Sequence, residues 1–349
     1  MLDMDINKIL ARLGQDETIR TEWIAFLKQL EARIDYQGSI RDELTGPILD
    51  ALCANVPVLR KTLQDGTQFQ FYYRSKIARD FLLCEPATPQ YAWEPQTSKL
   101  LCYFAEHARQ ALVGGAYFGD QAILMAKIMA HQSGVLHAFE PNQDQLTMLL
   151  ANASLNALDN IVAHPLGLWS DSDVALKLVG FDSFAHPEQC AVDDADSFAT
   201  ISVDDYCEQQ GVMHLDLIAL DLEGAEYHTL LGAKRVLAAN QRPQIVFEVH
   251  RHYVNWDQGL ANTEICRYLA NLGYHLFAIR DYNSNVDMQG RPVELIPVDK
   301  VYLDGPPHGF NMLAVTSLDL LQQPLFAFCE NVSPKLLPHR DPTLHAPLN

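Results

Sequence analysis

Apolar residues along the chain follow two different periods, and the change comes near residue 97. Residues 17–34 place apolar side chains at helical spacing with charges between them, which predicts an amphipathic helix. A second helical pattern follows Gly46-Pro47, and residues 68–74 alternate aromatic and polar side chains as a short half-buried strand does. The first part of the chain is therefore expected to be mainly helical.

From residue 97 onward, short apolar runs alternate with amphipathic stretches. The predicted strands are residues 111–113, 135–139, 161–168, 215–220, 245–249 and 274–279. The predicted helices are residues 121–130, 143–156, 227–240 and 262–272. This alternation predicts an α/β fold with a mostly parallel sheet and helices on both faces. Residues 180–200 show no period and are predicted to be a loop or insertion.

Breaks in these patterns divide the chain into three predicted parts. Prolines 86, 89 and 95 mark a join, so residues 1–88 form a mainly helical N-terminal region. Residues 89–333 form the α/β domain, and residues 334–349, with four prolines, are expected to be an irregular tail. The N-terminal helices carry more apolar surface than an isolated pair could bury, so they must pack against something else.

Composition narrows the class of protein. The 349 residues include 25 Lys plus Arg and 44 Asp plus Glu, a formal charge of −19, which disfavours nucleic acid and membrane surfaces as partners. Seven cysteines form no C-x-x-C pair, which indicates reduced thiols. No stretch approaches 18 uninterrupted apolar residues, and the acidic N-terminus does not resemble a signal peptide. The sequence therefore predicts a cytoplasmic enzyme.

Two signals follow the first predicted strands of the α/β domain. Glycines 114, 115 and 119 make a flexible turn after the first strand, although their spacing is not the G-x-G-x-x-G of dinucleotide sites. Glu140 ends the second strand, where an acidic residue accepts hydrogen bonds from a ribose. Each signal also has a plain structural explanation, a tight turn or a helix cap. Together they predict a nucleoside site, for adenosine or for NAD.

The fourth strand carries a more specific motif. Residues 221–226 read D-L-E-G-A-E, followed by L-L-G-A at 230–233, R-P at 242–243 and F-E-V-H at 247–250. Similar segments elsewhere are W-E-P-Q-T at 93–97, F-E-P-N at 139–142 and S-V-D-D at 202–205. In these motifs the chain, over about residues 90–285, resembles the FkbM family of S-adenosylmethionine-dependent methyltransferases.

The resemblance implies a Rossmann-like class I methyltransferase sheet that binds S-adenosylmethionine. Family members mostly methylate hydroxyls of sugars, polyketides and other specialised metabolites, so the expected partner is a small-molecule acceptor. By the same resemblance, Gly115, Ala116 and Gly119 would pass beneath the methionine part of the cofactor. The remaining cofactor-binding residues would be Glu94 and Thr97 ahead of the first strand, Glu140 at the ribose, and Asn142, Leu168 and Trp169 around the adenine.

Two positions depart from the family pattern. Val113 stands where the family usually has an Asp that can contact the cofactor's ammonium, and Ala219 stands where it usually has a Lys. Loss of a charged partner at a buried site costs a few kcal/mol unless another group replaces it. Glu94 and Asp120 are candidate replacements for the missing Asp.

Methyl transfer to a hydroxyl requires a group that removes the hydroxyl proton. Glu248, His250 and His252 alternate, so on one extended strand they would face the same way, and Asp221 ends the neighbouring strand. His250 is the expected base, with Asp221 and Glu248 as further catalytic groups. A divalent cation held by Asp221 and the E-x-H-x-H array is the less favoured alternative.

Two other functions compete with O-methylation. An NAD-linked oxidoreductase would share the glycine turn and Glu140 but would leave the D-L-E-G motif unexplained. A methyltransferase-like binding protein without turnover would account for Val113 and Ala219. Because the helices of residues 1–88 must pack against something, we expect this region to form a lid over the acceptor pocket, a homodimer contact, or both.

Overall fold

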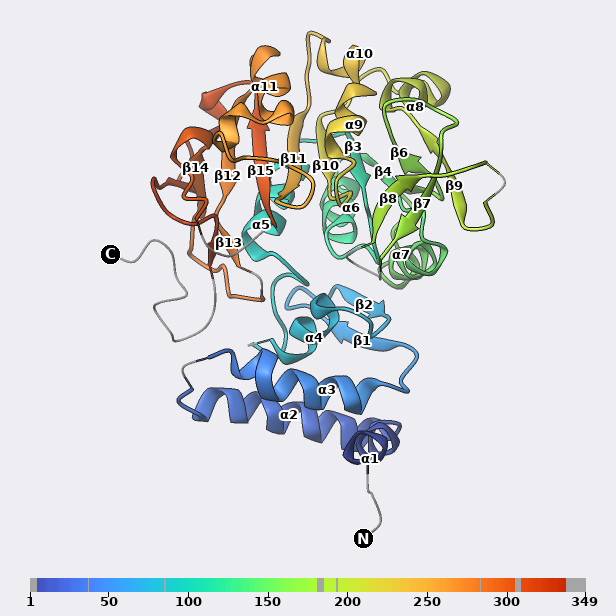
Figure 1. Ribbon diagram of the computed structural model, residues 1–349, viewed down its shortest axis with the longest axis vertical. Coiled ribbons are helices and arrows are strands. Elements are labelled where there is room, and N and C mark those ends of the chain that lie inside the picture. The colour runs from blue at the N-terminus through green and yellow to red at the C-terminus, as the bar shows by residue number, and fades with distance from the viewer. Residues whose placement is uncertain are drawn as a thin grey trace.

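A mixed nine-stranded sheet forms the centre of the α/β body (Figure 1). The computed structural model describes residues 5–36, 38–84, 86–180, 185–192, 194–282, 284–304 and 309–336. The strands of the sheet, in spatial order, are β16 (Phe326–Phe328), β14 (Val293–Pro297), β12 (His275–Ile279), β15 (Gly309–Val315), β11 (Gln244–His250), β10 (Leu217–Leu220), β3 (Gln110–Gly114), β4 (Val135–Phe139) and β5 (Ile161–His164). The five strands from β11 to β5 run parallel, whereas β15 is antiparallel to both β11 and β12. The strand order reverses between β3 and β10, which is where such sheets bind ligands.

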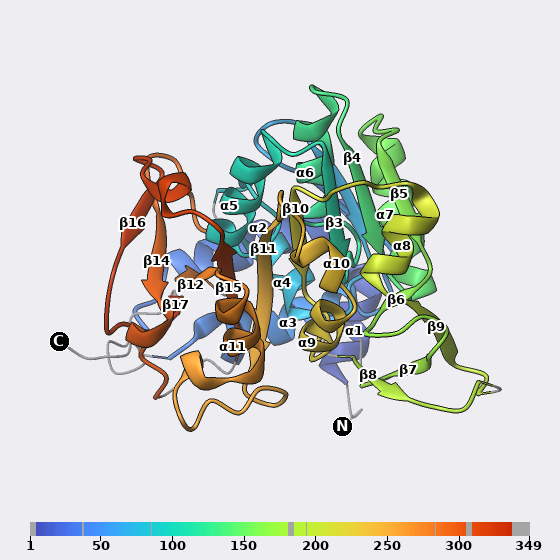
Figure 2. The same ribbon diagram turned by 90° about the horizontal axis from the view of Figure 1, so that it is seen from above.

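Helices cover both faces of the sheet, as the alternating pattern predicts. One face packs against α5 (Pro95–Ala105), α6 (Ala122–Ala130) and α7 (Gln143–Leu155). The other packs against α8 (Val203–Gln210), α9 (Glu226–Leu231), α10 (Lys234–Leu237) and α11 (Glu264–Asn271) (Figure 2). Short helices η3 (Leu260–Asn262), η4 (Val298–Lys300) and η5 (Leu318–Leu321) complete this part. The predicted α/β fold is confirmed.

The helix predicted over residues 227–240 is instead two helices, α9 and α10. The break lies at Gly232, where an added Cβ would come within 2.3 Å of the Trp169 carbonyl oxygen. This close approach to another backbone segment depends on tertiary packing, which helical periodicity does not report.

Residues 180–200, predicted to be a loop or insertion, contain two strands, so the prediction is wrong where it expects a loop at residues 186–189 and 197–200. Strands β7 (Ala175–Val179), β8 (His186–Gln189) and β9 (Ser197–Ile201) join β6 (Gly167–Leu168) in a second, four-stranded sheet ordered β6-β9-β7-β8. Residues 181–184 and 193 lie outside the described part of the chain. Strand β8 pairs with β7 through its backbone and has no buried side chain, so its sequence carries no alternation that could reveal it.

The N-terminal region contains the expected helices and strand. It comprises α1 (Ile6–Leu13), α2 (Glu17–Arg33), the π-helical η1 (Arg41–Thr45), α3 (Gly46–Cys53), the hairpin of β1 (Leu59–Thr62) and β2 (Gln68–Phe71), and α4 (Lys76–Leu83). In Figure 1 these elements lie below the α/β body, with α4 next to it. None of the helices in the described residues is long and apolar enough to cross a membrane.

The N-terminal region and the α/β body share one core. Phe69 and Phe71 of β2 pack with Phe81 of α4 and with Phe118, which follows β3, at ring-centroid distances of 5.4–6.0 Å. All four side chains are fully buried. The side chain of Asn152 on α7 also bonds the Gln70 backbone, accepting from its N–H at 2.7 Å and donating to its carbonyl at 2.9 Å. Asn156 does the same for Gln68, at 2.9 and 2.8 Å.

The start of the predicted irregular tail is ordered. Strand β17 (Lys335–Leu336) pairs in parallel with β13 (Asp281–Tyr282), so the prediction is wrong at these two residues. Residues 337–349 lie outside the described part of the chain. The pairing joins segments far apart in sequence, which local composition cannot reveal.

Candidate functional site

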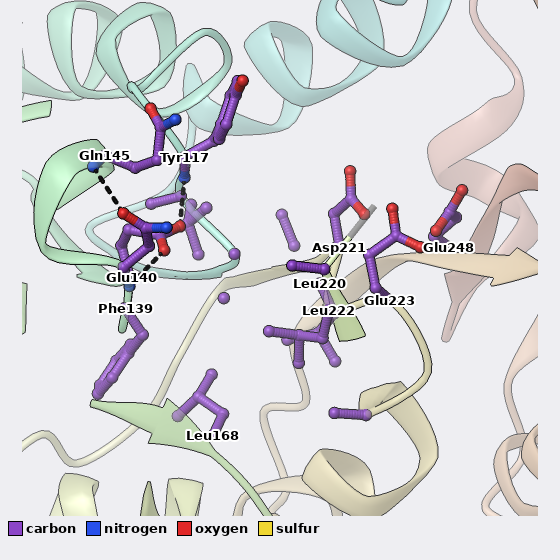
Figure 3. A pocket seen from close by; sticks show the side chains of 18 of the residues that line it. Tyr117, Phe139, Glu140, Gln145, Leu168, Leu220, Asp221, Leu222, Glu223 and Glu248 are labelled. Atoms are coloured by element: carbon purple, nitrogen blue, oxygen red, sulfur yellow. Dashed lines mark hydrogen bonds between the residues drawn. The ribbon is translucent and has the colours of Figure 1, made fainter. Parts of the chain in front are cut away.

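A cavity of about 470 Å³ opens at the carboxyl ends of the parallel strands. Its walls come from the segments that follow β3, β4 and β10, from the end of β11 itself, from the start of α4, and from the four-stranded sheet. Figure 3 shows two polar groups in it, one around Glu140 and the other formed by Asp221, Glu223 and Glu248. The cavity therefore lies where the reversal of strand order predicts a ligand site.

The glycine turn after β3 brings the chain close to the end of β10. Gly115 has φ +74°, and a Cβ there would lie 1.7 Å from the Asp221 carbonyl oxygen, so only glycine fits. The N–H groups of Gly115 and Ala116 both donate to the Phe139 carbonyl, at 3.0 and 3.1 Å. Because these amides are already bonded within the protein, they do not form the phosphate cradle of a dinucleotide site.

Glu140 is held in a fixed orientation at the end of β4. Its side chain is 7% exposed and lines the cavity. Its two carboxylate oxygens accept hydrogen bonds from the N–H groups of Tyr117 and Asn142, each at 2.8 Å (Figure 3). A carboxylate oxygen can accept more than one hydrogen bond, so a buried Glu140 remains suited to a ribose diol.

A cluster of carboxyl groups lies on the other side of the cavity. Ligand oxygens of Asp221, Glu223 and Glu248 all lie within 4.8 Å of one another. Asp221 is open to the cavity but lies deep in the fold, where desolvation, and then Glu94, raise its pKa to about 7. Desolvation, followed by Asp221, raises the pKa of Glu223 to about 8 and that of Glu248 well above its ordinary value. Burial thus favours protonated carboxyls in this cluster near neutral pH.

A second group of charges closes the wall beside this cluster. Glu94 is 7% exposed, and its carboxylate accepts from Lys335 Nζ at 2.9 Å and from Asn311 Nδ2 at 2.6 Å. Glu94 has φ +41°, a strained conformation for a non-glycine residue that is often found at functional sites. Asp120, also on the wall, has a pKa raised to about 7 by desolvation and then by Asp221 and Glu94.

His250 is the last residue of β11 and lines the cavity. Its Nδ1 accepts a hydrogen bond from the His252 N–H at 3.1 Å, and the two rings stack with centroids 4.7 Å apart. A neutral imidazole that accepts at Nδ1 carries its proton on Nε2. In this arrangement His250 is a hydrogen-bond donor through Nε2. A nitrogen that already carries a proton cannot accept the hydroxyl proton, which argues against the base role expected for His250.

Comparison with known proteins identifies the α/β body. Residues 114–276 match the family model described as the methyltransferase FkbM domain. The chain contains an FkbM methyltransferase domain. The resemblance seen in the sequence is therefore confirmed, and the sheet is a Rossmann-like class I methyltransferase sheet.

Solved structures with a similar fold include three methyltransferases. The methyltransferase FkbM of Methylobacillus flagellatus KT has a TM-score of 0.38 and 13% identity, over 86% of this chain and 60% of that one. The O-methyltransferase of Bacillus cereus in complex with SAH has a TM-score of 0.34 and 14% identity, over 63% and 81%. TomG of Streptomyces achromogenes, in complex with SAM, has a TM-score of 0.35 and 15% identity, over 66% and 84%. No curated protein matches the chain.

The FkbM domain and its flanking segments bring most of the predicted site residues to the cavity. Those that line it are Glu94, Gly115, Ala116, Glu140, Asn142, Leu168, Asp221, Glu248 and His250. Asn142 also caps α7, since its side chain accepts from the N–H groups of Asp144 and Gln145.

Four residues singled out from the sequence do not line the cavity. Thr97 is buried behind it, and Trp169 stacks on His228 with ring centroids 4.0 Å apart. Gly119 turns the chain toward α6 through its N–H bond to Ala116. His252 follows the end of β11, so the expectation that it continues one extended strand with Glu248 and His250 is wrong, although its ring stacks on that of His250.

Several site residues escaped sequence reasoning. Lys335 and Asn311 lie beyond residues 114–276, and Glu223 lies inside the recognised D-L-E-G motif without an expected role. Asn311 had a usable signal, because it is a polar residue within the apolar strand GFNMLAV. Lys335 had none, because its strand pairing is long-range.

The carboxyl cluster predicts an unusual dependence of stability on pH. The folded pKa values of Asp221 and Glu223 in the cluster, and of the buried Glu226 next to it, are raised to about 7, 8 and 7, mainly by desolvation. Between the ordinary carboxyl pKa near 4 and these values the folded state holds more protons than the unfolded chain, so the free energy of unfolding falls as pH rises. We expect the melting temperature of the ligand-free protein to increase from about pH 8 to about pH 6, measured by calorimetry.

The control is the double variant Asp221→Asn, Glu223→Gln. It removes two of the titrating groups, so its melting temperature should vary less with pH than that of the wild type. Parallel curves for the two proteins would contradict the assignment of this effect to the cluster.

Proposed function

We propose that the protein transfers a methyl group from S-adenosylmethionine to a hydroxyl of a small specialised metabolite or sugar. The observation that carries the proposal is one cavity of an FkbM domain with Glu140 fixed at one side and ionisable carboxyls at the other. A nucleoside cation fits this distribution, with its diol at Glu140 and its positive charges near Glu94, Asp120 and Asp221.

The residues present fit this cofactor better than NAD. Phe139 and Leu168 are buried apolar side chains on the cavity wall near Glu140, as an adenine ring requires (Figure 3). A pyrophosphate would need donors, but the turn amides of Gly115 and Ala116 are bonded to the Phe139 carbonyl. The acidic wall would also repel its negative charges.

The side chains on the acidic wall can remove the hydroxyl proton. S-adenosylmethionine supplies an electrophilic methyl group on a sulfonium. We assign the base to Asp221, whose pKa of about 7 is matched to neutral pH. Desolvation raises the pKa of Glu248, and its side chain hydrogen-bonds Asp221. His250, with its proton on Nε2, would donate a hydrogen bond that orients the acceptor.

A divalent cation on Asp221, Glu223 and Glu248 is the less favoured alternative. These three carboxyls are close enough to share an ion, but His250, which the sequence places among the ligands, is not part of the group. A cation would hold all three carboxyls ionised and lower the pKa of a bound hydroxyl. Loss of turnover in EDTA, restored by Mg²⁺ or Mn²⁺, would establish this alternative.

The cell compartment and the role of residues 1–88 belong to the same proposal. We place the reaction in the cytoplasm.

Lys76 and Ile77 at the start of α4 line the cavity, which supports a role of residues 1–88 as a lid over the acceptor. Phe26 on α2 is 53% exposed and is a candidate for a homodimer contact.

Calorimetry and a turnover assay test the proposed function together. We expect S-adenosylmethionine and S-adenosylhomocysteine to bind and NAD not to bind. Methyl transfer from labelled S-adenosylmethionine to a panel of sugars and hydroxylated metabolites then separates an enzyme from a binding protein. Binding of NAD with hydride transfer would instead establish the oxidoreductase.

Glu140 provides the matching variant. Glu140→Ala is expected to weaken S-adenosylmethionine binding by about 1–3 kcal/mol, because charge-assisted hydrogen bonds to the ribose are lost. Asp159→Asn, which changes an exposed carboxylate outside the cavity, is the control and should bind normally. Unchanged affinity in a folded Glu140→Ala protein would remove Glu140 from the cofactor site.

A further inference from the structure

Lys335 is a buried ammonium group in the wall of the cavity. Strand β17 carries it there, because the register of β17 with β13 sets Lys335 opposite Asp281. Its side chain is only 7% exposed, and its Nζ donates to Glu94 Oε1 at 2.9 Å. Burial would lower the pKa of Lys335, but Glu94 and Asp281 raise it above its ordinary value, so the group is charged.

Lys335 and Asn311 together fix the Glu94 carboxylate. Each of the two Glu94 oxygens has one protein donor, and Asn311 Nδ2 is also 3.3 Å from Thr97 Oγ1. Asp281 supports the same corner, since its carboxylate accepts from the N–H groups of Gln96 and Thr97 at 3.0 and 2.7 Å. The start of α5 is thereby tied to β13, β15 and β17.

Glu94 lines the cavity together with Val113 and Asp120. Val113, at the end of β3, offers no carboxylate there, while Glu94 and Asp120 both line the cavity, and Glu94 contributes, after desolvation and Asp221, to the raised pKa of Asp120. A carboxylate that already accepts two hydrogen bonds still has lone pairs for a ligand ammonium. Without Lys335, the buried Glu94 carboxylate would lose its charged partner and one of its two hydrogen bonds.

We propose that Lys335 is a positioning residue for the amino-acid part of the cofactor. The C-terminal strand β17 delivers an ammonium that pairs with the Glu94 carboxylate and holds it oriented toward the ammonium of bound S-adenosylmethionine. The cofactor site of this protein is therefore completed from outside its FkbM domain. This inference rests on the proposed function, because it concerns the same cofactor.

The test compares ligands with and without the amino-acid part. 5′-Methylthioadenosine has the adenosine and sulfur of the cofactor but no ammonium or carboxylate. Lys335→Met is expected to weaken S-adenosylmethionine and S-adenosylhomocysteine binding by about tenfold or more, the scale of one charge-assisted hydrogen bond, with methylthioadenosine affinity nearly unchanged. Glu94→Gln should show the same pattern in calorimetry.

Three further proteins make the comparison specific. Lys335→Arg keeps the positive charge and should restore most of the affinity lost in Lys335→Met. Lys300→Met removes a partly exposed lysine of η4 outside the cavity and should bind all three ligands normally. If Lys335→Met does not fold, the double variant Glu94→Gln, Lys335→Met removes both charges without leaving one unpaired, and the same ligand comparison applies.

The outcomes separate this inference from the proposed function. If Lys335→Met weakens the binding of all three ligands equally, or of none, the role proposed for Lys335 is wrong. The proposed function still stands in that case if the wild-type protein binds S-adenosylmethionine. A wild-type protein that binds none of the three ligands would overturn both.

Discussion

Replacing Asp221 with Asn is expected to lower kcat by about 10²- to 10⁴-fold, the range attributed to a general base, while S-adenosylmethionine still binds. Asp221 directly follows β10 beside the Gly115 turn and faces the cavity. Its pKa of about 7 lets it accept a proton at neutral pH, and an amide cannot do so. Single-turnover methyl transfer at saturating cofactor, with calorimetry on the same protein, measures the two effects separately.

The pH profile gives this expectation a second readout. Desolvation and Glu94 raise the Asp221 pKa to about 7, so kcat should rise with pH through that value as the carboxyl loses its proton. Asp221→Asn should lose this rising limb. Glu223→Gln is the control, because a carboxyl with a pKa of about 8 is mostly protonated at neutral pH and resembles an amide there.

Two variants of His250 distinguish a donor from a base. Glutamine places an N–H donor near the position of Nε2, so His250→Gln should retain much more activity than His250→Ala, which we expect to lose about 10²-fold. Equal loss in both, with a normal Asp221→Asn enzyme, would return the base to His250. The sequence favours His250 as the base, but it does not show that the His252 N–H donates to His250 Nδ1. That hydrogen bond depends on how the chain turns after β11.

Removal of residues 1–88 is expected to abolish folding of the remaining chain. Phe118 and the α7 surface would lose the buried partners that β2 and α4 provide, and a contiguous apolar face would meet water. Size-exclusion chromatography and circular dichroism of a fragment starting at residue 89 measure this. A monodisperse, fully active fragment would contradict it and would show that the predicted boundary separates independent units.

A point variant tests the same contact in the whole protein. Phe71→Ala is expected to lower the free energy of unfolding by about 3–5 kcal/mol, the usual cost of emptying an aromatic site in a core. Phe26→Ala, on the exposed side of α2, should change it by less than about 0.5 kcal/mol. A shift of Phe26→Ala from dimer to monomer would support the homodimer contact.

Sequence patterns within a short window predict the strands of the central sheet and the residues that directly follow them. Apolar runs located the central strands of the sheet, and the Gly115 turn and Glu140 follow strands at the point where parallel sheets bind ligands. The second sheet was missed because β8 carries no alternating burial, and Lys335 was missed because its position depends on pairing with a strand more than fifty residues earlier. Such long-range pairings leave no signal within a sequence window.

The side chains of Asn152 and Asn156 have a consequence for solubility. They bond the backbone N–H and carbonyl groups of Gln68 and Gln70, which β1 does not use, so the outer edge of β2 has no row of open hydrogen-bonding groups. Open strand edges are templates for pairing between molecules. Helix α7 therefore shields the hairpin against edge-to-edge aggregation, and detachment of the N-terminal region would expose this edge and the phenylalanines beside it in one step.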